Sequence, residues 1–179
     1  SLDGLSPIGE DRIAKSLKEI VEPEFLSVVE RKPAVYQGGF GFQVEAGVGF
    51  GGKAGRDVGA TNEDGIAERK TEIMRFANKV PLLFDGGGCA LSKAVQSVDW
   101  KRYGIKDADN APITIFIHLM SVHVPYTGAG KQAVADEPEV MEELRLALME
   151  TGRKIYRYVA MKRREEEKQQ KRKLFMKYA

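Results

Sequence analysis

The sequence predicts a sandwich of the α+β or α/β class, followed by one long C-terminal helix. Three observations lead to this prediction. Residues 25–50 are rich in aromatic and β-branched residues separated by glycines, which is typical of strands. Residues 113–122 are apolar at both alternating sets of positions, as in a central strand buried on both faces. Residues 140–159 repeat apolar side chains at helical spacing.

The composition is that of an ordinary globular protein, with 42% apolar and 30% charged residues among 179, and predicts one full domain with appendages. No apolar run approaches the roughly 18 residues of a membrane-spanning helix, and the N-terminus lacks the order of a secretion signal. We therefore expect a soluble, intracellular chain with no membrane partner. One cysteine (Cys89) and two histidines (His118 and His123) provide neither a disulfide nor the ligands of a structural zinc site.

Charge is segregated along the chain. Residues 153–177 hold 11 basic and three acidic residues, a net charge of +8, whereas the rest holds 17 basic and 23 acidic residues, a net charge of −6. Such asymmetry favours a polyanionic partner at the C-terminal end. A solvated helix face is the alternative that charge alone leaves open.

A short helix is expected near the N-terminus. Ser6 followed by Pro7 is typical of an N-cap and a first helical residue, and the apolar residues that follow share one face as far as Val21. Pro23 ends the pattern, so the predicted helix runs from Pro7 to Val21. Because one short amphipathic helix cannot bury itself, we expect it to be the end of a larger upstream unit.

Strands fill residues 25–50, and three glycines between Tyr36 and Phe42 predict a hairpin connection or a bulge. The next segment, Lys53 to Gly65, has almost no apolar residue and is rich in glycine. We expect a mobile surface loop there.

The middle of the chain alternates strand and helix. Residues 71–84 predict a strand and then a turn into Gly86–Gly88, and residues 89–98 predict a crossover helix. The central strand at residues 113–122 follows.

The last helix is expected to begin at Glu137 and Pro138. Its apolar positions make a helical stripe at Val140, Leu144, Ala147, Leu148, Thr151, Ile155, Tyr158 and Val159. Residues 162–173 then contain no apolar residue, over roughly 18 Å of helix at about 1.5 Å per residue. A helix that is polar all round normally bridges between domains. Apolar residues return at 174–176, where we expect packing against something beyond this chain.

Two glycine-rich segments are candidate phosphate sites. Gly47, Gly49 and Gly52 spell GxGxxG, but the helix that would receive a pyrophosphate is missing from the predicted elements, so we reject a dinucleotide site. The segment TGAGKQ (residues 127–132) follows the central strand, yet it lacks the first glycine and the hydroxyl residue of a Walker A loop. It presents Lys131 at the end of a strand, either as a phosphate sensor or as a solvated loop lysine.

The two histidines have no evident carboxylate or hydroxyl partner for catalysis, so His118 and His123 are assigned to packing in the core or on the surface. The segment DWKRY (residues 99–103) interleaves aromatic and basic residues, as nucleic-acid-binding surfaces do. Anchoring of Trp100 in the core explains the same residues equally well.

Four segments together closely resemble the B subunit of archaeal type IIB DNA topoisomerases, the topoisomerase VI family. They are RFANKVPLLFDGGG (residues 75–88), WKRY (100–103), HVPYTGAGKQAVADEPEV (123–140) and the basic helix after GRK (152–154). The resemblance covers about residues 20–179 and implies the transducer of that subunit. Its fold is similar to ribosomal protein S5 domain 2, an α+β mixed sheet backed by helices with a long stalk helix.

The resemblance implies three parts: residues 1–22 as the end of a helix-two-turn-helix domain, residues 23–136 as the transducer core, and residues 137–179 as the stalk helix. An ATPase domain is expected upstream and would bind ATP and Mg²⁺, so this chain is expected to hold no cofactor, no catalytic residue and no metal. The implied partners are DNA, the DNA-cleaving A subunit and a second B subunit, in an A2B2 heterotetramer in the cytoplasm, associated with the nucleoid.

The same resemblance implies roles for individual residues. Lys131 corresponds to a switch lysine that senses the ATP γ-phosphate, supported by Gly128, Gly130 and Gln132. Residues associated with DNA correspond to Trp100, Lys101, Tyr103, Lys162, Arg163 and Arg164.

Two other interpretations remain open. The first is a stand-alone S5-like nucleic-acid-binding module whose active surface is the basic C-terminal helix. The second is a small-molecule kinase of similar fold, which the incomplete phosphate loop disfavours.

Overall fold

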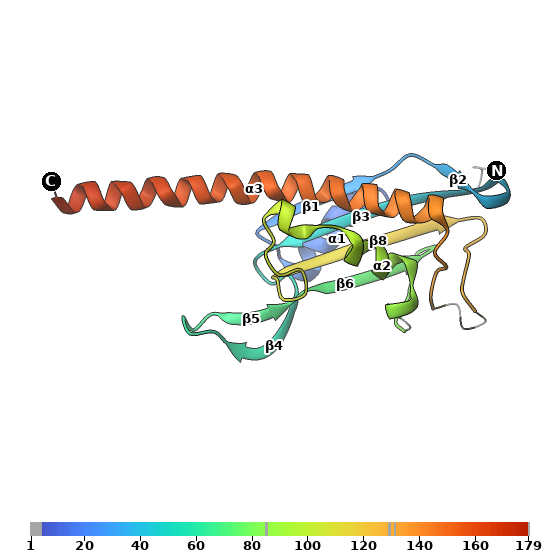
Figure 1. The fold of residues 1–179 in the computed structure, drawn as a ribbon, viewed down its shortest axis with the longest axis horizontal. Coiled ribbons are helices and arrows are strands. Elements are labelled where there is room, and N and C mark those ends of the chain that lie inside the picture. The colour runs from blue at the N-terminus through green and yellow to red at the C-terminus, as the bar shows by residue number, and fades with distance from the viewer. Residues whose placement is uncertain (1–4, 85, 129, 131, 179) are drawn as a thin grey trace.

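The computed structural model describes residues 5–84, 86–128, 130 and 132–178. A mixed six-stranded sheet forms its centre, with the order β1-β3-β8-β6-β7 and with β2 paired to β3 (Figure 1). The elements are α1 (Glu10–Val21), β1 (Phe25–Glu30), β2 (Ala34–Tyr36), η1 (Gln37–Gly39), β3 (Phe40–Phe50), β4 (Arg56–Thr61), β5 (Ala67–Lys70), β6 (Glu72–Ala77), β7 (Val80–Pro81), η2 (Gly86–Gly88), α2 (Ala90–Ser97), η3 (Trp100–Tyr103), β8 (Ile113–Ser121) and α3 (Pro138–Tyr178). The α+β class is confirmed.

The central strand β8 organises the sheet. It pairs antiparallel with β3 and parallel with β6, and all nine of its residues are buried. Burial on both faces explains why its sequence is apolar at consecutive positions. The segment between the parallel strands β6 and β8 contains α2, as expected of a crossover helix.

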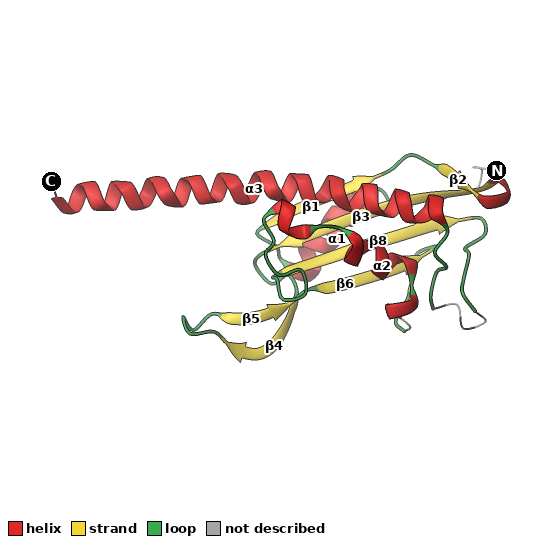
Figure 2. Ribbon diagram, in the orientation of Figure 1, coloured by secondary structure: helices red, strands yellow, loops and turns green. Residues whose placement is uncertain are grey.

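Helices cover the two faces of the sheet unequally. The main core lies under α2 and α3, whereas α1 packs against the opposite face (Figure 2). Gly47 of β3 lies directly beneath α1, and a Cβ atom added there would come within 2.8 Å of the Leu17 side chain. The first two glycines of the rejected GxGxxG segment therefore have a structural reason: they let a helix approach the sheet closely.

Helix α1 begins at Glu10, three residues later than expected. Ser6 does not cap it; the N-cap is Gly9, whose φ of 94° favours glycine. The backbone N–H groups of Ile8 and Gly9 instead donate to the buried carboxylate of Glu45, at 3.0 and 2.7 Å. This carboxylate holds the preceding residues against the sheet, and the predicted start at Pro7 is wrong for that reason.

The expected loop at residues 53–65 is wrong in part, because it contains β4, which pairs with β5 in a separate two-stranded sheet. Every residue of β4 is exposed, so the strand carries no alternation of apolar and polar residues. Arg69 fastens the base of this hairpin by donating hydrogen bonds to the carbonyls of Ala54, Lys53 and Gly55, at 2.6, 2.9 and 2.9 Å.

Helix α3 is 41 residues long and begins at Pro138, as the sequence predicts. Its first half packs on the sheet, and the last contacts with the body are a stack of Tyr158 on Phe25, with ring centroids 4.6 Å apart, and an ion pair between Lys162 and Glu24. Beyond Lys162 the helix projects from the body (Figure 1). Among the helices that the structure describes, none is both long and apolar enough to cross a membrane.

Candidate functional site

The loop after β8 folds back on itself as a narrow hairpin. Tyr126 and Val134 form an isolated bridge, and the Thr127 N–H donates to the Ala133 carbonyl at 2.9 Å. Lys131 lies outside the described residues. Gly128 and Gln132, which flank it, lie at the tip of this hairpin, and the bridge places that tip at the end of the sheet where β8 ends.

Val134 ties the base of the hairpin to the start of α2. Its carbonyl accepts a hydrogen bond from the Ala90 N–H at 2.8 Å, and its own N–H donates to the buried Sγ of Cys89 at 3.3 Å. Lys93 of α2 also pairs with Asp136 at 2.8 Å. The hairpin is therefore attached firmly at its base, which the sequence alone did not indicate.

Gln132 joins the hairpin to a second loop. Its Oε1 accepts hydrogen bonds from the backbone N–H groups of Leu83 and Phe84, at 3.0 and 3.4 Å. Arg75, only 7% exposed, donates from Nη2 to the carbonyls of Leu82 and Phe84 and from Nη1 to the carbonyl of Gln132. We call these contacts the Arg75–Gln132 brace. Sequence reasoning assigned Gln132 to the loop but missed Arg75, because no local pattern records a partner 57 residues away.

The aromatic residues of the WKRY segment lie in the core. Trp100 is 3% exposed and donates from Nε1 to the Val95 carbonyl at 2.8 Å, and Tyr103 is 6% exposed against α3. Both rings therefore lie mostly inside the core, which is the arrangement that anchoring of this segment requires. Lys101 and Arg102 are exposed.

A surface groove runs between η3 and α3. It has a volume of about 320 Å³ and is lined by Arg102, Tyr103, Met149, Arg153, Tyr156 and Arg157. Three of the lining residues are arginines, which are suited to the phosphates of a polyanion because guanidinium forks bind phosphate oxygens in pairs. The groove was not predicted, since its residues are separated by some 50 positions along the chain.

The three basic residues predicted on α3 do not share one face. At about 100° per residue, Arg164 lies roughly 20° around the helix from Arg153, and Lys162 lies about 180° from it. Lys162 accordingly faces the body and pairs with Glu24, and this hydrogen bond, against a smaller effect of burial, raises the pKa of Lys162. Arg163 and Arg164 are exposed.

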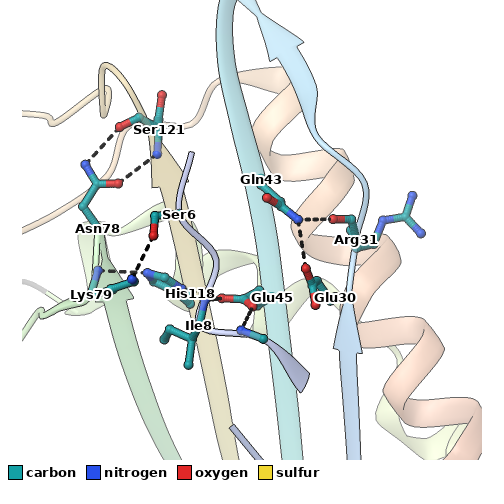
Figure 3. A network of polar contacts seen from close by, with 11 residues as sticks. Ser6, Ile8, Glu30, Arg31, Gln43, Glu45, Asn78, Lys79, His118 and Ser121 are labelled. Carbon is teal, nitrogen blue, oxygen red and sulfur yellow. Dashed lines mark hydrogen bonds and ion pairs between the residues drawn. The ribbon is translucent and has the colours of Figure 1, made fainter. Parts of the chain in front are cut away.

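A buried polar network crosses the sheet beneath α1 (Figure 3). His118 and Glu45 are fully buried, with Nδ1 of the imidazole 2.9 Å from Glu45 Oε1. The Lys79 N–H donates to His118 Nε2 at 2.9 Å, so the neutral ring carries its proton on Nδ1 and donates it to Glu45. Burial raises the pKa of Glu45, but the hydrogen bonds from His118, Gly9 and Ile8 together outweigh it and leave that pKa below its usual value.

This network is structural. His118 lies in the core, as expected, but the expectation that it has no carboxylate partner is wrong, because Glu45 is that partner. The exposed His123 stacks on the Phe40 ring with centroids 4.7 Å apart. Within the described residues, no three His, Cys, Asp or Glu side chains are grouped so that they could hold a metal ion.

Residues 1–171 match the protein family described as "Topoisomerase VI B subunit, transducer". The chain is 51% identical over 175 residues to the B subunit of type 2 DNA topoisomerase 6 from Methanothermobacter thermautotrophicus, and 46% identical to that from Pyrococcus furiosus. These alignments cover 98% of this chain but only 32% and 28% of the relatives. The chain thus spans about a third of their length.

Among solved structures, the DNA gyrase B-subunit from Myxococcus xanthus is similar at 15% identity with a TM-score of 0.42, over 80% of this chain and 42% of the gyrase chain.

Proposed function

This chain belongs to the transducer family of the topoisomerase VI B subunit, and from that premise we propose that it relays the state of a bound nucleotide to a DNA-cleaving partner. In this proposal Lys131 senses the γ-phosphate of ATP. The A subunit, a second B subunit and DNA are its partners. ATP and Mg²⁺ are bound by an ATPase domain upstream in the full-length protein.

One observation supports the relay above all others: the predicted sensor and the stalk helix are adjacent. Helix α3 begins at Pro138, seven residues after Lys131. The intervening residues are held by the Val134 contacts and by hydrogen bonds from the N–H of Glu137 to the Ala135 carbonyl and from the N–H of Met141 to the Glu137 carbonyl, both 2.9 Å. A displacement of the hairpin therefore passes directly into the start of α3.

One lysine can supply much of the free energy needed to shift the relay from one state to the other. A lysine charge about 4 Å from one phosphate charge gains about 4 kcal/mol at an effective dielectric constant near 20, before desolvation. Inverting a two-state equilibrium from 1:99 to 99:1 needs about 5.5 kcal/mol. Loss of the γ-phosphate on hydrolysis would remove the partner of this lysine and release the relay.

Replacing Lys131 tests the proposal. In the full-length protein assembled with its partner, we expect Lys131→Ala to reduce ATP-dependent strand passage at least tenfold, which corresponds to about 1.4 kcal/mol. The melting temperature and DNA affinity are expected to stay unchanged. Lys106→Ala, at an exposed lysine of another loop, is the control. Wild-type strand passage by the Lys131→Ala assembly would refute the assignment.

We further propose that the groove between η3 and α3 binds the DNA backbone, together with Lys101, Arg163 and Arg164. The proposal follows from the three arginines of the groove and from the position of Arg164 on the same side of α3. The location of Lys162 on the other side argues for a different role for that residue. Phosphate contacts of this kind bind without reading sequence.

Neutralising two groove arginines tests this contact. For the variant with Arg153→Gln and Arg157→Gln we expect weaker binding to duplex DNA, and a plot of log affinity against log salt whose slope is shallower by about 1.8, or 0.9 per lost phosphate contact. The matched control neutralises the exposed Arg12 and Lys15 of α1. Equal slopes for the two variants would favour the solvated helix face.

The stand-alone nucleic-acid-binding module remains the alternative function, and the same assays separate it from the relay. If this chain acts only as a nucleic-acid-binding module, it binds DNA through the groove with an affinity independent of nucleotide, and Lys131→Ala changes nothing.

A further inference from the structure

We propose that Arg75 and Gln132 are positioning residues that hold the Lys131 hairpin and residues 82–84 together as one unit. Gln132 then acts through the geometry of the loop and not by contact with a nucleotide. This inference rests on the proposed function of Lys131, because it concerns the same hairpin.

The contacts of Gln132 support it first. The carbonyl oxygen of a glutamine side chain accepts two hydrogen bonds, and Gln132 Oε1 receives both from the backbone N–H groups of Leu83 and Phe84. These two contacts fix the orientation of the side chain. They cross from one loop to another, over 49 and 48 residues of sequence, so Gln132 cannot move without one of the loops giving way.

Arg75 completes the brace from strand β6 by hydrogen-bonding to both loops. Its guanidinium donates to the carbonyls of Leu82 and Phe84, at 2.9 and 2.8 Å, and to the backbone carbonyl of Gln132 at 3.2 Å. Hydrogen bonds from a charged donor are stronger than those between neutral groups, and a planar fork can serve several carbonyls at once. Because Arg75 is a buried residue of strand β6, 7% exposed, its hydrogen bonds attach both loops to the central sheet.

Apolar packing holds Leu82, which is 5% exposed in the main core, but it does not hold Leu83 and Phe84. The side chains of Leu83 and Phe84 are 72% and 67% exposed. Their backbone groups, in contrast, are held by Gln132 and Arg75. The positions of Leu83, Phe84 and Gln132 relative to one another therefore depend on these five hydrogen bonds, and we expect the Leu83 and Phe84 backbone to loosen when they are removed.

Hydrogen exchange in this chain, without nucleotide, provides the first test. In Gln132→Met, which keeps the length of the side chain but loses both acceptor sites, we expect the amides of Leu83 and Phe84 to exchange about tenfold faster than in the wild type. In Gln132→Glu, which keeps the acceptors, we expect exchange at the wild-type rate. Gln96→Met, on the exposed face of α2, controls for the effect of replacing a glutamine with methionine outside the brace. Unchanged exchange in Gln132→Met would overturn the proposal.

Nucleotide coupling in the full-length protein provides the second test, run beside Lys131→Ala. We expect Gln132→Met to lower ATP-dependent strand passage severalfold and Gln132→Glu to restore most of it, whereas direct contact of the Gln132 amide with a phosphate would make the added negative charge the more damaging change. Loss with Gln132→Glu but not with Gln132→Met would therefore refute the brace.

The two proposals fail in different ways. If Lys131→Ala has no effect, the proposed function falls whatever Gln132 does. Suppose that Lys131→Ala abolishes ATP-dependent strand passage, whereas Gln132→Met speeds hydrogen exchange at Leu83 and Phe84 but leaves strand passage at the wild-type level. The Arg75–Gln132 brace then does not position the hairpin for function. Arg75→Lys, which keeps the charge but not the fork, is expected to speed exchange at Leu83 and Phe84 as well, and it serves as a second variant.

Discussion

Glu45→Gln is expected to destabilise the chain by about 1 to 3 kcal/mol, the cost of leaving a buried hydrogen-bond donor without its acceptor. Both carboxylate oxygens of Glu45 accept hydrogen bonds: Oε1 from His118 and Ile8, and Oε2 from Gly9. An amide of the same shape must turn its NH₂ group toward one of these donors. The isosteric change therefore leaves two donors facing each other in a site with no exposure to water.

Urea unfolding at neutral pH measures this effect. Glu30→Gln is the matched control, because Glu30 lies opposite Glu45 on β1, is exposed, and accepts a long 3.5 Å contact from Gln43. We expect the control to change the free energy of unfolding by less than about 0.5 kcal/mol. Equal stability of the two variants would mean that the network beneath α1 contributes nothing.

The same carboxylate makes stability depend on pH in a defined direction. The pKa of Glu45 is lower in the folded than in the unfolded chain, so the unfolded state binds its proton first as pH falls. The contribution of Glu45 is therefore complete above the unfolded pKa of about 4.3 and is lost as pH falls through the lower, folded value. Glu45→Gln is expected to flatten the acid limb of the stability curve, and an unchanged limb would contradict this assignment.

Gly152→Ala is expected to destabilise the chain by about 1 to 3 kcal/mol through overpacking. In a helix interior this substitution normally stabilises by roughly 0.5 to 1 kcal/mol, so the expected sign is reversed. A Cβ atom at Gly152 would lie 2.6 Å from Cδ2 of the Tyr103 ring, which is buried. The ring cannot move away without disturbing the core around Trp100.

A double-mutant cycle with Tyr103→Leu isolates this contact, with unfolding free energies measured for all four proteins. In the Tyr103→Leu background we expect Gly152→Ala to cost at least 1 kcal/mol less than in the wild type. Stabilisation by Gly152→Ala alone would show that η3 does not pack on α3 as closely as described.

The elements with a strong periodic pattern could be predicted from sequence. β8 reads as a central strand because burial on both faces selects apolar residues at every position, and the first half of α3 reads as a helix because only one stripe of it meets the sheet. In both elements, burial acts at many neighbouring positions, so apolar residues recur at regular intervals in the sequence.

The elements that were mispredicted lack such a pattern. β4 buries nothing, so its strand pairing leaves no apolar alternation. The start of α1 is decided by Glu45, which lies 36 residues away from Gly9 in the sequence. The capping pattern at Ser6 and Pro7 is local, whereas the start of the helix is set by hydrogen bonds to Glu45, and no residue near Ser6 in the sequence indicates them.

The candidate site divides in the same way. The hairpin between β8 and α3 could be located from its place in the chain, whereas the Arg75–Gln132 brace and the groove depend on pairs of residues far apart in sequence. Residue type alone could not decide between the two interpretations of Trp100 and Tyr103, because aromatic residues next to basic ones occur both on nucleic-acid-binding surfaces and at the ends of buried helices.

The ion pair of Lys162 with Glu24 marks the point at which α3 leaves the body. Beyond it the helix is supported at one end and projects freely (Figure 1). Sixteen residues from Arg163 to Tyr178 make an arm of about 24 Å at about 1.5 Å per residue. A tilt of 10° about the Lys162–Glu24 contact would displace the tip by about 4 Å over that length. Small angular changes at this fulcrum are therefore magnified at the far end, where Phe175 and Tyr178 are 73% and 81% exposed.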